Sequence, residues 1–231
     1  SKTFDYATSC SSENSIIVVD SVYHKLINEL EKEGGALLSA EEKKILGKKM
    51  WNENHIINRD IIAKRASKIA TLVGLDTNKY SKTEFLMVEE DGVGKKYPFS
   101  REKLSPVLTV YRAKDFDHAV DLVNKILQHQ GQGHSCSIHS KNEDNIMRLG
   151  NELPVCRVIV NQAHCFATGG NFDNGLPFSL SMGCGSWGGN SINENLHWKH
   201  FLQSTKIVRE IPPREPSVEE IFGDYWAAVG T

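Results

Sequence analysis

The sequence predicts an α/β fold built on a largely parallel sheet. Apolar runs rich in β-branched residues alternate with segments of helical periodicity over most of the 231 residues. A content of 39% hydrophobic and 24% charged residues is typical of a globular protein with a sizeable core, in one large domain or two small ones. No internal repeat or low-complexity segment interrupts the alternation.

Five runs have the composition of strands. The strongest are VLTVYRAK from residue 107 and VCRVIVN from residue 155, whereas IIVV from residue 16 fits a buried strand or a buried helical turn. Because helical segments separate the runs, we expect parallel pairing through crossover connections. The predicted strands are 16–19, 84–90, 107–114, 134–140 and 155–161.

Five segments between these runs have helical spacing of apolar residues. In the first, Val22, Leu26 and Leu30 recur at that spacing, and Gly34 and Gly35 then end the helix. Residues 162–191 contain seven glycines and no sustained periodicity, so a loop is predicted there. The predicted helices are 21–33, 40–50, 59–73, 115–129 and 144–149.

The tail has its own pattern. Residues 204–210, STKIVRE, alternate as a strand does, and the prolines of 211–216 end it. The S-x-x-E pattern at Ser217 predicts a capped helix over 217–226. A strand outside the main domain is typical of an arm that packs on another chain, which predicts a homodimer or a larger homo-oligomer formed by strand addition.

Composition excludes several classes of partner. The net charge of −2 indicates no general attraction to nucleic acid or to a membrane surface. No apolar run approaches the roughly 20 residues of a membrane span, and the first residues lack the pattern of a signal peptide. Five scattered cysteines, an odd number, argue against a disulfide framework and predict a reducing, cytoplasmic location.

Residue type alone offers candidates for chemistry without choosing among them. Cys10 lies in a polar turn before an apolar run, as a reactive thiol or a structural one. His134 is a general base or a core histidine, and Glu102 is a functional carboxylate or a solvated charge. His164 follows the strand at 155–161, at the sheet end where α/β proteins place their sites. A cysteine–histidine dyad is therefore one reading of the sequence.

Metal and nucleotide motifs are weak. His134 and His139 flank Cys136, but no zinc-site spacing is present, and strand alternation sends Cys136 and His139 to opposite faces. The glycines of 183–190, GCGSWGGN, match neither a phosphate loop nor a dinucleotide fingerprint. Close backbone packing is the expected reason for them.

Four stretches together resemble the aldehyde dehydrogenase superfamily, and specifically its coenzyme A-acylating branch. They are FDYATSCSSENSIIVVDSVY around Cys10, REKLSPVLTVYRAKDFDHAV around Glu102, GQGHSCSIHS around His134, and LSMGCGSWGGNSINEN near the end. The resemblance covers essentially the whole chain. It implies a three-layer αβα catalytic domain over residues 1–203 and a C-terminal strand arm over 204–231. Family members also have an N-terminal NAD-binding domain, which is missing from this sequence.

The resemblance also implies roles for three residues. Cys10 matches the nucleophile that attacks an aldehyde, passes hydride to NAD or NADP, and leaves its acyl group as a thioester for the thiol of coenzyme A, the co-substrate. Glu102 matches the glutamate of E-K-L-S-P, which orients the nicotinamide ribose. His134 matches a histidine implicated in catalysis, by deprotonating a thiol or by contacting coenzyme A.

The loop NQAHCFATGGNFDNG from Asn161 resembles that of acylating enzymes for short anionic aldehydes. Ser11, Asn161 and His164 are the expected substrate ligands, because such donors bind a sulfonate or a carboxylate. The resemblance favours sulfoacetaldehyde, with succinate semialdehyde or acetaldehyde as alternatives. Two other readings stay open: an assembly module without turnover, and a cysteine–histidine hydrolase.

Overall fold

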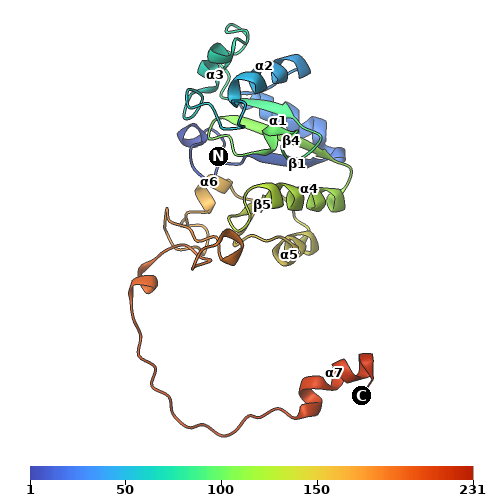
Figure 1. The fold of residues 1–231 in the computed structure, drawn as a ribbon, viewed down its shortest axis with the longest axis vertical. Helices are drawn as coiled ribbons and strands as arrows, with labels where there is room; N and C mark the ends of the chain where they lie inside the picture. The colour runs from blue at the N-terminus through green and yellow to red at the C-terminus, as the bar shows by residue number, and fades with distance from the viewer. Residues whose placement is uncertain (231) are drawn as a thin grey trace. The chain divides into compact units, whose positions relative to one another are not determined.

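The structure is a computed structural model, and it describes residues 1–230. The chain divides into two compact units, Ser1–His197 and a second that begins at Trp198. All the strands that the described residues form lie in the first unit (Figure 1). They are β1 (Ser15–Val19), β2 (Gly35–Leu37), β3 (Phe85–Glu89), β4 (Val107–Ala113), β5 (Cys136–Ile138) and β6 (Val158–Val160).

Helices alternate with these strands along the chain, as predicted. Helix α2 begins and ends where the sequence predicts, because Ser39 and Glu42 form a reciprocal capping box at its first turn. The helices are α1 (Tyr23–Lys32), α2 (Ala40–Met50), α3 (Ala66–Val73), α4 (Phe116–His129), α5 (Glu143–Glu152), α6 (His164–Ala167) and α7 (Val218–Val229).

The strands form two parallel sheets. The larger has the order β1-β4-β3-β2, and the smaller pairs β5 with β6. Every pairing between these strands is parallel; for example, Ile16 lies opposite Val110 and Leu86 lies opposite Val107. The predicted parallel α/β architecture is therefore confirmed.

The larger sheet is covered on both faces. Alternate residues of β3 and β4 point to α1 on one side, where Phe85, Met87, Leu108 and Val110 pack on Tyr23 and its neighbours. The other side packs on α2 and α3, and further along the sheet on α4. The second face of α4 packs on α5 and the small sheet, which places α4 between the two sheets (Figure 1). These layers confirm the three-layer αβα prediction.

Helix α3 is shorter than predicted. Residues 59–63 form turns, and the helix begins at Ala66 rather than at Arg59. Asn58 accepts hydrogen bonds that hold these turns, and Ala63 has a left-handed φ of 56°, which an α-helix cannot contain.

The buried face of α1 also differs from the prediction. Tyr23 and Ile27 are buried, whereas Val22 and Leu26 are 45% and 37% exposed and line a cleft. The short strand β2, next to β3, was not predicted, because its glycine-led sequence reads as the end of a helix.

The second unit contains α7 but no strand among its described residues. Ser217 and Glu220 form the predicted capping box of α7. Residues 204–210, predicted as a strand that pairs with another chain, have no regular secondary structure within this single chain. A strand needs a hydrogen-bonded partner, and alternation in sequence does not supply one. Within residues 1–230, no helix is long and apolar enough to cross a bilayer.

Candidate active site

A strained turn presents Cys10. The three residues Asp5, Tyr6 and Ala7 have left-handed φ angles of 47°, 50° and 59°, which reverse the chain before the turn. The N–H of Ser12 then donates to the Ser9 carbonyl at 2.9 Å and closes the turn that contains Cys10. The Cys10 thiol is exposed on this turn, and β1 begins shortly afterwards, at Ser15.

Three other cysteines are less accessible to solvent than Cys10, and their burial makes their thiols less acidic. Burial raises the pKa of Cys136 to about 12, and it also raises the pKa of Cys156 and Cys165. These thiols stay protonated at neutral pH, and a protonated thiol is a poor nucleophile. Cys10 is exposed, and the other four cysteines are half-buried.

His134 lies beside Cys10, although 124 residues separate them. Its Nε2 is 3.2 Å from Cys10 Sγ, and its Nδ1 is 2.6 Å from the Ser135 hydroxyl. The backbone of Gly133 sets the position of the imidazole: it has a φ of +90° and donates to the Pro154 carbonyl at 2.7 Å. This geometry fits a neutral imidazole that donates from Nδ1–H to Ser135 and accepts from the thiol at Nε2.

Burial, with smaller contributions from the nearby His164 and Arg157, lowers the pKa of His134 to about 4. His134 is therefore neutral at pH 7, with a lone pair available on one ring nitrogen. A neutral imidazole next to a thiol is the arrangement that a general base requires.

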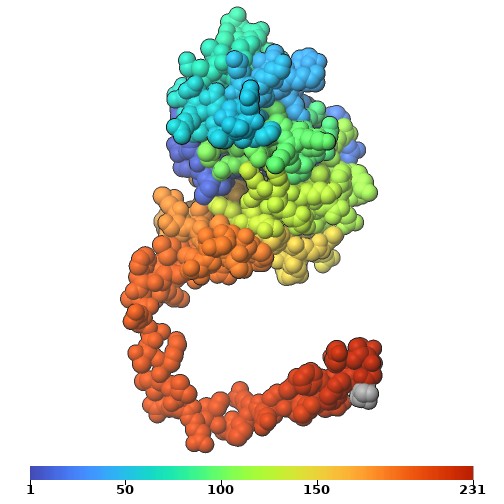
Figure 2. Space-filling model, viewed as in Figure 1, coloured from blue at the N-terminus to red at the C-terminus, as the bar shows by residue number. Residues whose placement is uncertain are grey.

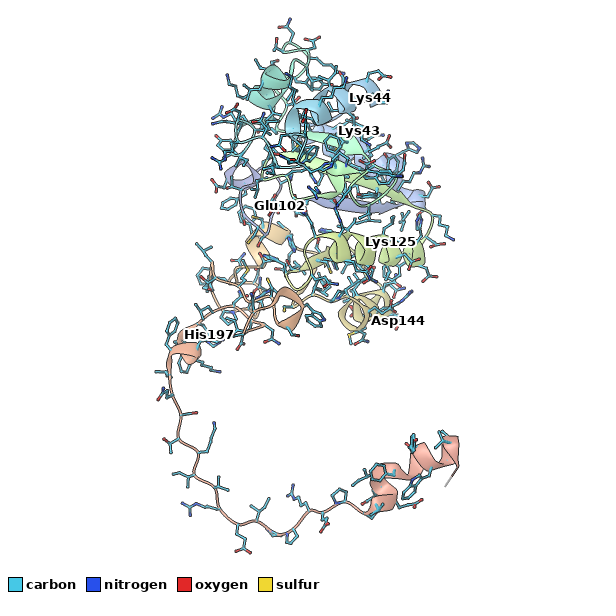
Figure 3. The ribbon with its side chains drawn as sticks, viewed as in Figure 1. Lys43, Lys44, Glu102, Lys125, Asp144 and His197 are labelled. Carbon is cyan, nitrogen blue, oxygen red and sulfur yellow. The ribbon has the colours of Figure 1, made fainter. Side chains whose placement is uncertain are left out.

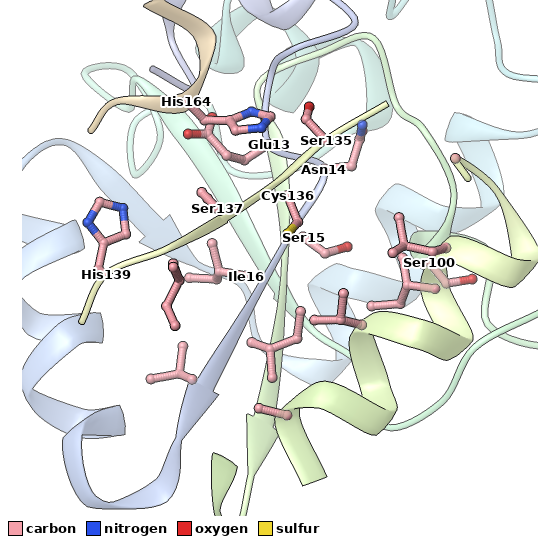
Figure 4. Close-up of a pocket in the computed structure, with 18 of the residues that line it drawn as sticks. Glu13, Asn14, Ser15, Ile16, Ser100, Ser135, Cys136, Ser137, His139 and His164 are labelled. Atoms are coloured by element: carbon pink, nitrogen blue, oxygen red, sulfur yellow. The ribbon is translucent and has the colours of Figure 1, made fainter. Parts of the chain in front are cut away.

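A cleft of about 1340 Å³ connects four of the sequence-predicted residues. Cys10, Glu102, His134 and His164 all line it, together with β1, α4 and β5. In Figure 4, His164 lies beside Glu13 and near Ser135, while His139 lies apart from them. The predicted nucleophile, base and cofactor carboxylate thus share one concave site, as active sites commonly do.

Glu102 is exposed at this cleft, on a loop fixed by its neighbour (Figure 3). The ammonium group of Lys103 is fully buried and donates to the carbonyls of Phe99 and Arg101 at 2.9 and 2.7 Å. Burial lowers the pKa of Lys103 well below its usual value. The backbone N–H of Glu102 donates to the side-chain oxygen of Gln130 at 3.1 Å, which also holds the loop in place.

His164 and Ser11 meet beneath the Cys10 turn. His164 Nδ1 is 2.7 Å from the Ser11 carbonyl, so its N–H holds the backbone next to the thiol. The contact of Cys165 N–H with Ser1 Oγ at 2.9 Å brings the same segment against the N-terminal residues, blue and orange in Figure 2. Burial lowers the pKa of His164.

Asn161 lies outside the cleft. Its side-chain oxygen accepts from the Ser140 N–H at 2.9 Å, and its amide donates to the Ser140 carbonyl at 2.7 Å. Asn161 has a φ of 53°, so it forms the corner between β6 and the following loop. The structure does not bring it to Cys10, and we leave it out of the proposed site.

Two residues of the site were missed in the sequence. Arg157 is 5% exposed and donates from Nη1 to the carbonyls of His134 and Gly183 at 3.2 and 3.0 Å. Asn14 accepts from the Lys103 N–H at 3.0 Å and so joins the Cys10 turn to the Glu102 loop. A charged residue inside the apolar run VCRVIV was a usable signal for Arg157, whereas nothing local marks Asn14.

Comparison with known proteins gives consistent matches. The model of the aldehyde dehydrogenase family matches residues 3–179. A sulfoacetaldehyde dehydrogenase (acylating) from Cupriavidus necator is 54% identical over 100% of this chain and 46% of its own length. A succinate-semialdehyde dehydrogenase (acetylating) from Clostridium kluyveri is 34% identical over 96% of this chain and 49% of its own.

A solved structure agrees with the fold. An acetylating aldehyde dehydrogenase from Geobacillus thermoglucosidasius superposes with a TM-score of 0.84 at 35% identity, over 93% of this chain and 47% of that one. The chain thus spans about half the length of the relatives that it matches. The family model, the curated relatives and the fold agree, and the chain belongs to the aldehyde dehydrogenase family.

Proposed function

We propose that the whole enzyme carrying this chain oxidises a short anionic aldehyde to its acyl-CoA, with Cys10 as the nucleophile and NAD or NADP as the oxidant. The observation that carries the proposal is the 3.2 Å contact between Cys10 Sγ and His134 Nε2 in a cleft that Glu102 also lines. The identity of 54% to an acylating dehydrogenase supports the reaction class.

His134 accepts a proton twice in this mechanism. In its neutral form it first accepts the Cys10 thiol proton at Nε2, so that the sulfur can attack the aldehyde carbon. The Ser135 hydroxyl accepts from Nδ1–H and holds the tautomer that leaves Nε2 free. Once the acyl group is on Cys10, His134 releases this first proton to solvent, and its Nε2 can then accept the proton of the coenzyme A thiol. The coenzyme A sulfur attacks the thioester, and the Cys10 sulfur leaves and takes the proton back from His134.

The backbone around Cys10 stabilises charge on the substrate. In the described part of the chain, the Cys10 N–H forms no hydrogen bond, so it can donate to the oxygen that becomes negative during attack. The Ser9–Ser12 turn holds that N–H in place through the 2.9 Å bond between Ser12 N–H and Ser9 O.

Glu102 fits the role of holding a nicotinamide cofactor. Its carboxylate is exposed at the cleft, has no ion-pair partner within residues 1–230, and can accept hydrogen bonds from two ribose hydroxyls. The cofactor, when bound, supplies the acceptor for hydride from the aldehyde carbon. The buried Lys103 fixes the loop that presents this carboxylate.

We favour sulfoacetaldehyde as the aldehyde, over succinate semialdehyde and acetaldehyde. The support is the difference between 54% identity to the sulfoacetaldehyde enzyme and 34% to the succinate-semialdehyde enzyme. His164 Nδ1 is 2.7 Å from the carbonyl of Ser11, the residue after the nucleophile, so both residues lie next to the reacting group.

The test is the dependence of turnover on coenzyme A in the whole enzyme. With sulfoacetaldehyde we expect NAD(P)H and acyl-CoA to form in equal amounts, and both to be lost in Cys10→Ala. Cys156→Ala is the matched control, because Cys156 lies outside the cleft and is expected to keep activity. Oxidation that continues at the same rate without coenzyme A would overturn the acylating assignment, and activity in Cys10→Ala would overturn the nucleophile.

We also propose that the whole enzyme is a cytoplasmic homodimer or a larger homo-oligomer. The proposal is supported by the extended, exposed segment 202–216, whose backbone groups are available for pairing with another chain. Light scattering on the whole enzyme and on a form ending at His197 measures the number of subunits in each. The same number of subunits in both forms would contradict an assembly through the arm.

A further inference from the structure

Five buried polar atoms, in residues near Cys10 or linked to it through hydrogen bonds, have no hydrogen-bond partner among residues 1–230. The residues that carry them are between 1% and 7% exposed. An unsatisfied buried polar atom is costly and uncommon, and several together indicate that something else binds there. They are Ser11 Oγ, Ser12 Oγ, Arg157 Nη2, His164 Nε2 and Thr168 Oγ1.

Hydrogen bonds connect these residues to the catalytic pair on one side. From His134, which contacts Cys10, the chain of contacts runs through its carbonyl to Arg157 Nη1 at 3.2 Å. Arg157 Nε donates to the Asn195 side-chain oxygen at 2.9 Å, and the Asn195 amide donates to the Thr168 carbonyl at 2.9 Å. Arg157 and Thr168 are thus held by one fully buried asparagine.

A second series of contacts leads from Thr168 back to Cys10. The Thr168 N–H donates to the His164 carbonyl at 3.1 Å, one turn earlier in the chain. His164 Nδ1–H donates to the carbonyl of Ser11 at 2.7 Å, and Ser11 is bonded to Cys10. Four of the five unpartnered atoms, all but Ser12 Oγ, therefore belong to residues that form a continuous ring of contacts beginning and ending at the nucleophile.

The ring has a positive character. Arg157 is buried, and its hydrogen-bond partners are two carbonyls and an amide oxygen, with no carboxylate among them. The groups that face His164 are the Glu13 carboxylate, which favours protonation, and the His134 imidazole. Since the Nδ1 proton of His164 is committed to Ser11, its Nε2 carries a lone pair while the imidazole is neutral. A bound anion favours protonation of this imidazole, which adds the second proton at Nε2 and makes that atom a donor.

We propose that Arg157 Nη2, Thr168 Oγ1 and His164 Nε2 bind the sulfonate of the substrate whose aldehyde carbon Cys10 attacks. This rests on the proposed function and names the group that the site selects. A sulfonate has three oxygens that accept from three directions, and in sulfoacetaldehyde one methylene separates it from the reacting carbon. Charged acceptors make the stronger hydrogen bonds, so an anion repays the burial of these donors better than a neutral group does.

The test measures the subsite without cofactor or coenzyme A. The Cys10 sulfur displaces bromide from 2-bromoethanesulfonate or from the neutral 2-bromoethanol, forming a carbon–sulfur bond and releasing bromide. Mass spectrometry of the Cys10 peptide gives both rates in the whole enzyme, and each is divided by the rate with free glutathione. We expect the sulfonate reagent to be preferred by about tenfold or more, the size of one charge-assisted hydrogen bond.

Four variants test which residues cause the preference for the sulfonate reagent. Thr168→Val is isosteric and removes only the unpartnered hydroxyl, while Thr168→Ser restores one. His164→Asn keeps an amide donor for the Ser11 carbonyl and lacks the Nε2 position, whereas His164→Gln places an amide near Nε2. We expect Thr168→Val and His164→Asn to lose most of the preference, and the serine and glutamine variants to recover part of it. Thr71→Val, on the exposed surface of α3, is the remote control.

The outcomes separate the two proposals. Equal normalised rates for the two reagents in the wild-type enzyme would overturn the subsite, whatever the enzyme's turnover. A preference that survives in both Thr168→Val and His164→Asn would overturn this set of residues. Alkylation needs neither NAD(P) nor coenzyme A. A failure of acyl-CoA formation would therefore count against the proposed function, whereas the subsite is tested by the reagent preference alone.

Discussion

Gly133→Ala is the sharpest test of how the GCGSWGGN loop supports the site. Gly133 precedes His134 and has a φ of +90°, a conformation that residues with a side chain rarely adopt. A Cβ there would lie 2.1 Å from the Cys184 carbonyl oxygen and 2.8 Å from the Gly188 nitrogen. Both are backbone atoms of the loop, so neither can rotate away. The glycine lets two backbones meet directly behind the base.

Two effects set the expected size. The left-handed conformation costs an alanine about 1–2 kcal/mol. Contacts of 2.1 Å must open to ordinary van der Waals distance, which displaces either the loop or His134 by about 1 Å or more. A displacement of about 1 Å at reacting groups reduces the rate by about 10²-fold. We therefore expect kcat/KM to fall by about 10²-fold, together with a lower midpoint of thermal unfolding.

Gly131→Ala is the matched control. Gly131 has a φ of +111°, but a Cβ there meets nothing within 4 Å. It carries the backbone strain without the clash, so we expect a smaller loss of stability, from the strain alone, and a much smaller loss of activity. Steady-state kinetics of coenzyme A-dependent oxidation and thermal unfolding of both variants give the comparison. Equal losses of activity in the two variants would refute the packing argument.

Three further predictions concern the base, the cofactor carboxylate and a helix cap. The pKa of His134 is about 4 in the folded state and near 6.5 in the unfolded state, so the folded state loses stability as pH falls from 6.5 towards 4, by about 2 kcal/mol at pH 5. Urea unfolding of wild type and His134→Gln at pH 5 and 8 measures this loss. A difference in unfolding free energy between the two proteins that is the same at both pH values would contradict the prediction. Glu102→Gln should raise KM for the nicotinamide cofactor about tenfold, because an amide makes weaker hydrogen bonds to the ribose hydroxyls than a carboxylate does. KM for coenzyme A is the internal control, and an equal rise in both KM values would argue against ribose binding. Ser39→Ala removes the capping box of α2 and should lower the free energy of unfolding by about 1 kcal/mol. Ser81→Ala, at an exposed position, is the control. Equal free energies of unfolding for the two variants would contradict the role of the cap.

Much of the fold was readable from the sequence because the relevant signals are local. The apolar run from residue 107 is buried on both faces in β4, and the capping pattern at Ser217 begins α7 as predicted. The failures have non-local causes. The left-handed Ala63 delays α3, and β2 exists only because β3 lies beside it. The strand predicted at 204–210 finds no partner strand in the described part of the chain.

The site was less readable because its parts are distant in sequence. Family resemblance, not residue type, selected Cys10 and His134, and the structure places them 3.2 Å apart across 124 residues. Asn161 looked like a ligand by composition, but both of its amide atoms bind Ser140. Arg157 is a charged residue within an apolar strand, which the sequence shows. Its hydrogen bonds to the site depend on the tertiary fold, which the sequence does not show.

The most direct test of the central claim is to look for the acyl group on Cys10. The whole enzyme is mixed with sulfoacetaldehyde and NAD(P) in the absence of coenzyme A, quenched in acid and analysed by peptide mass spectrometry. The account predicts a sulfoacetyl group on the Cys10 peptide, formed with NAD(P)H and removed when coenzyme A is added before the quench. An unmodified Cys10 in enzyme that has produced its NAD(P)H, or an acyl group on another cysteine, would contradict it.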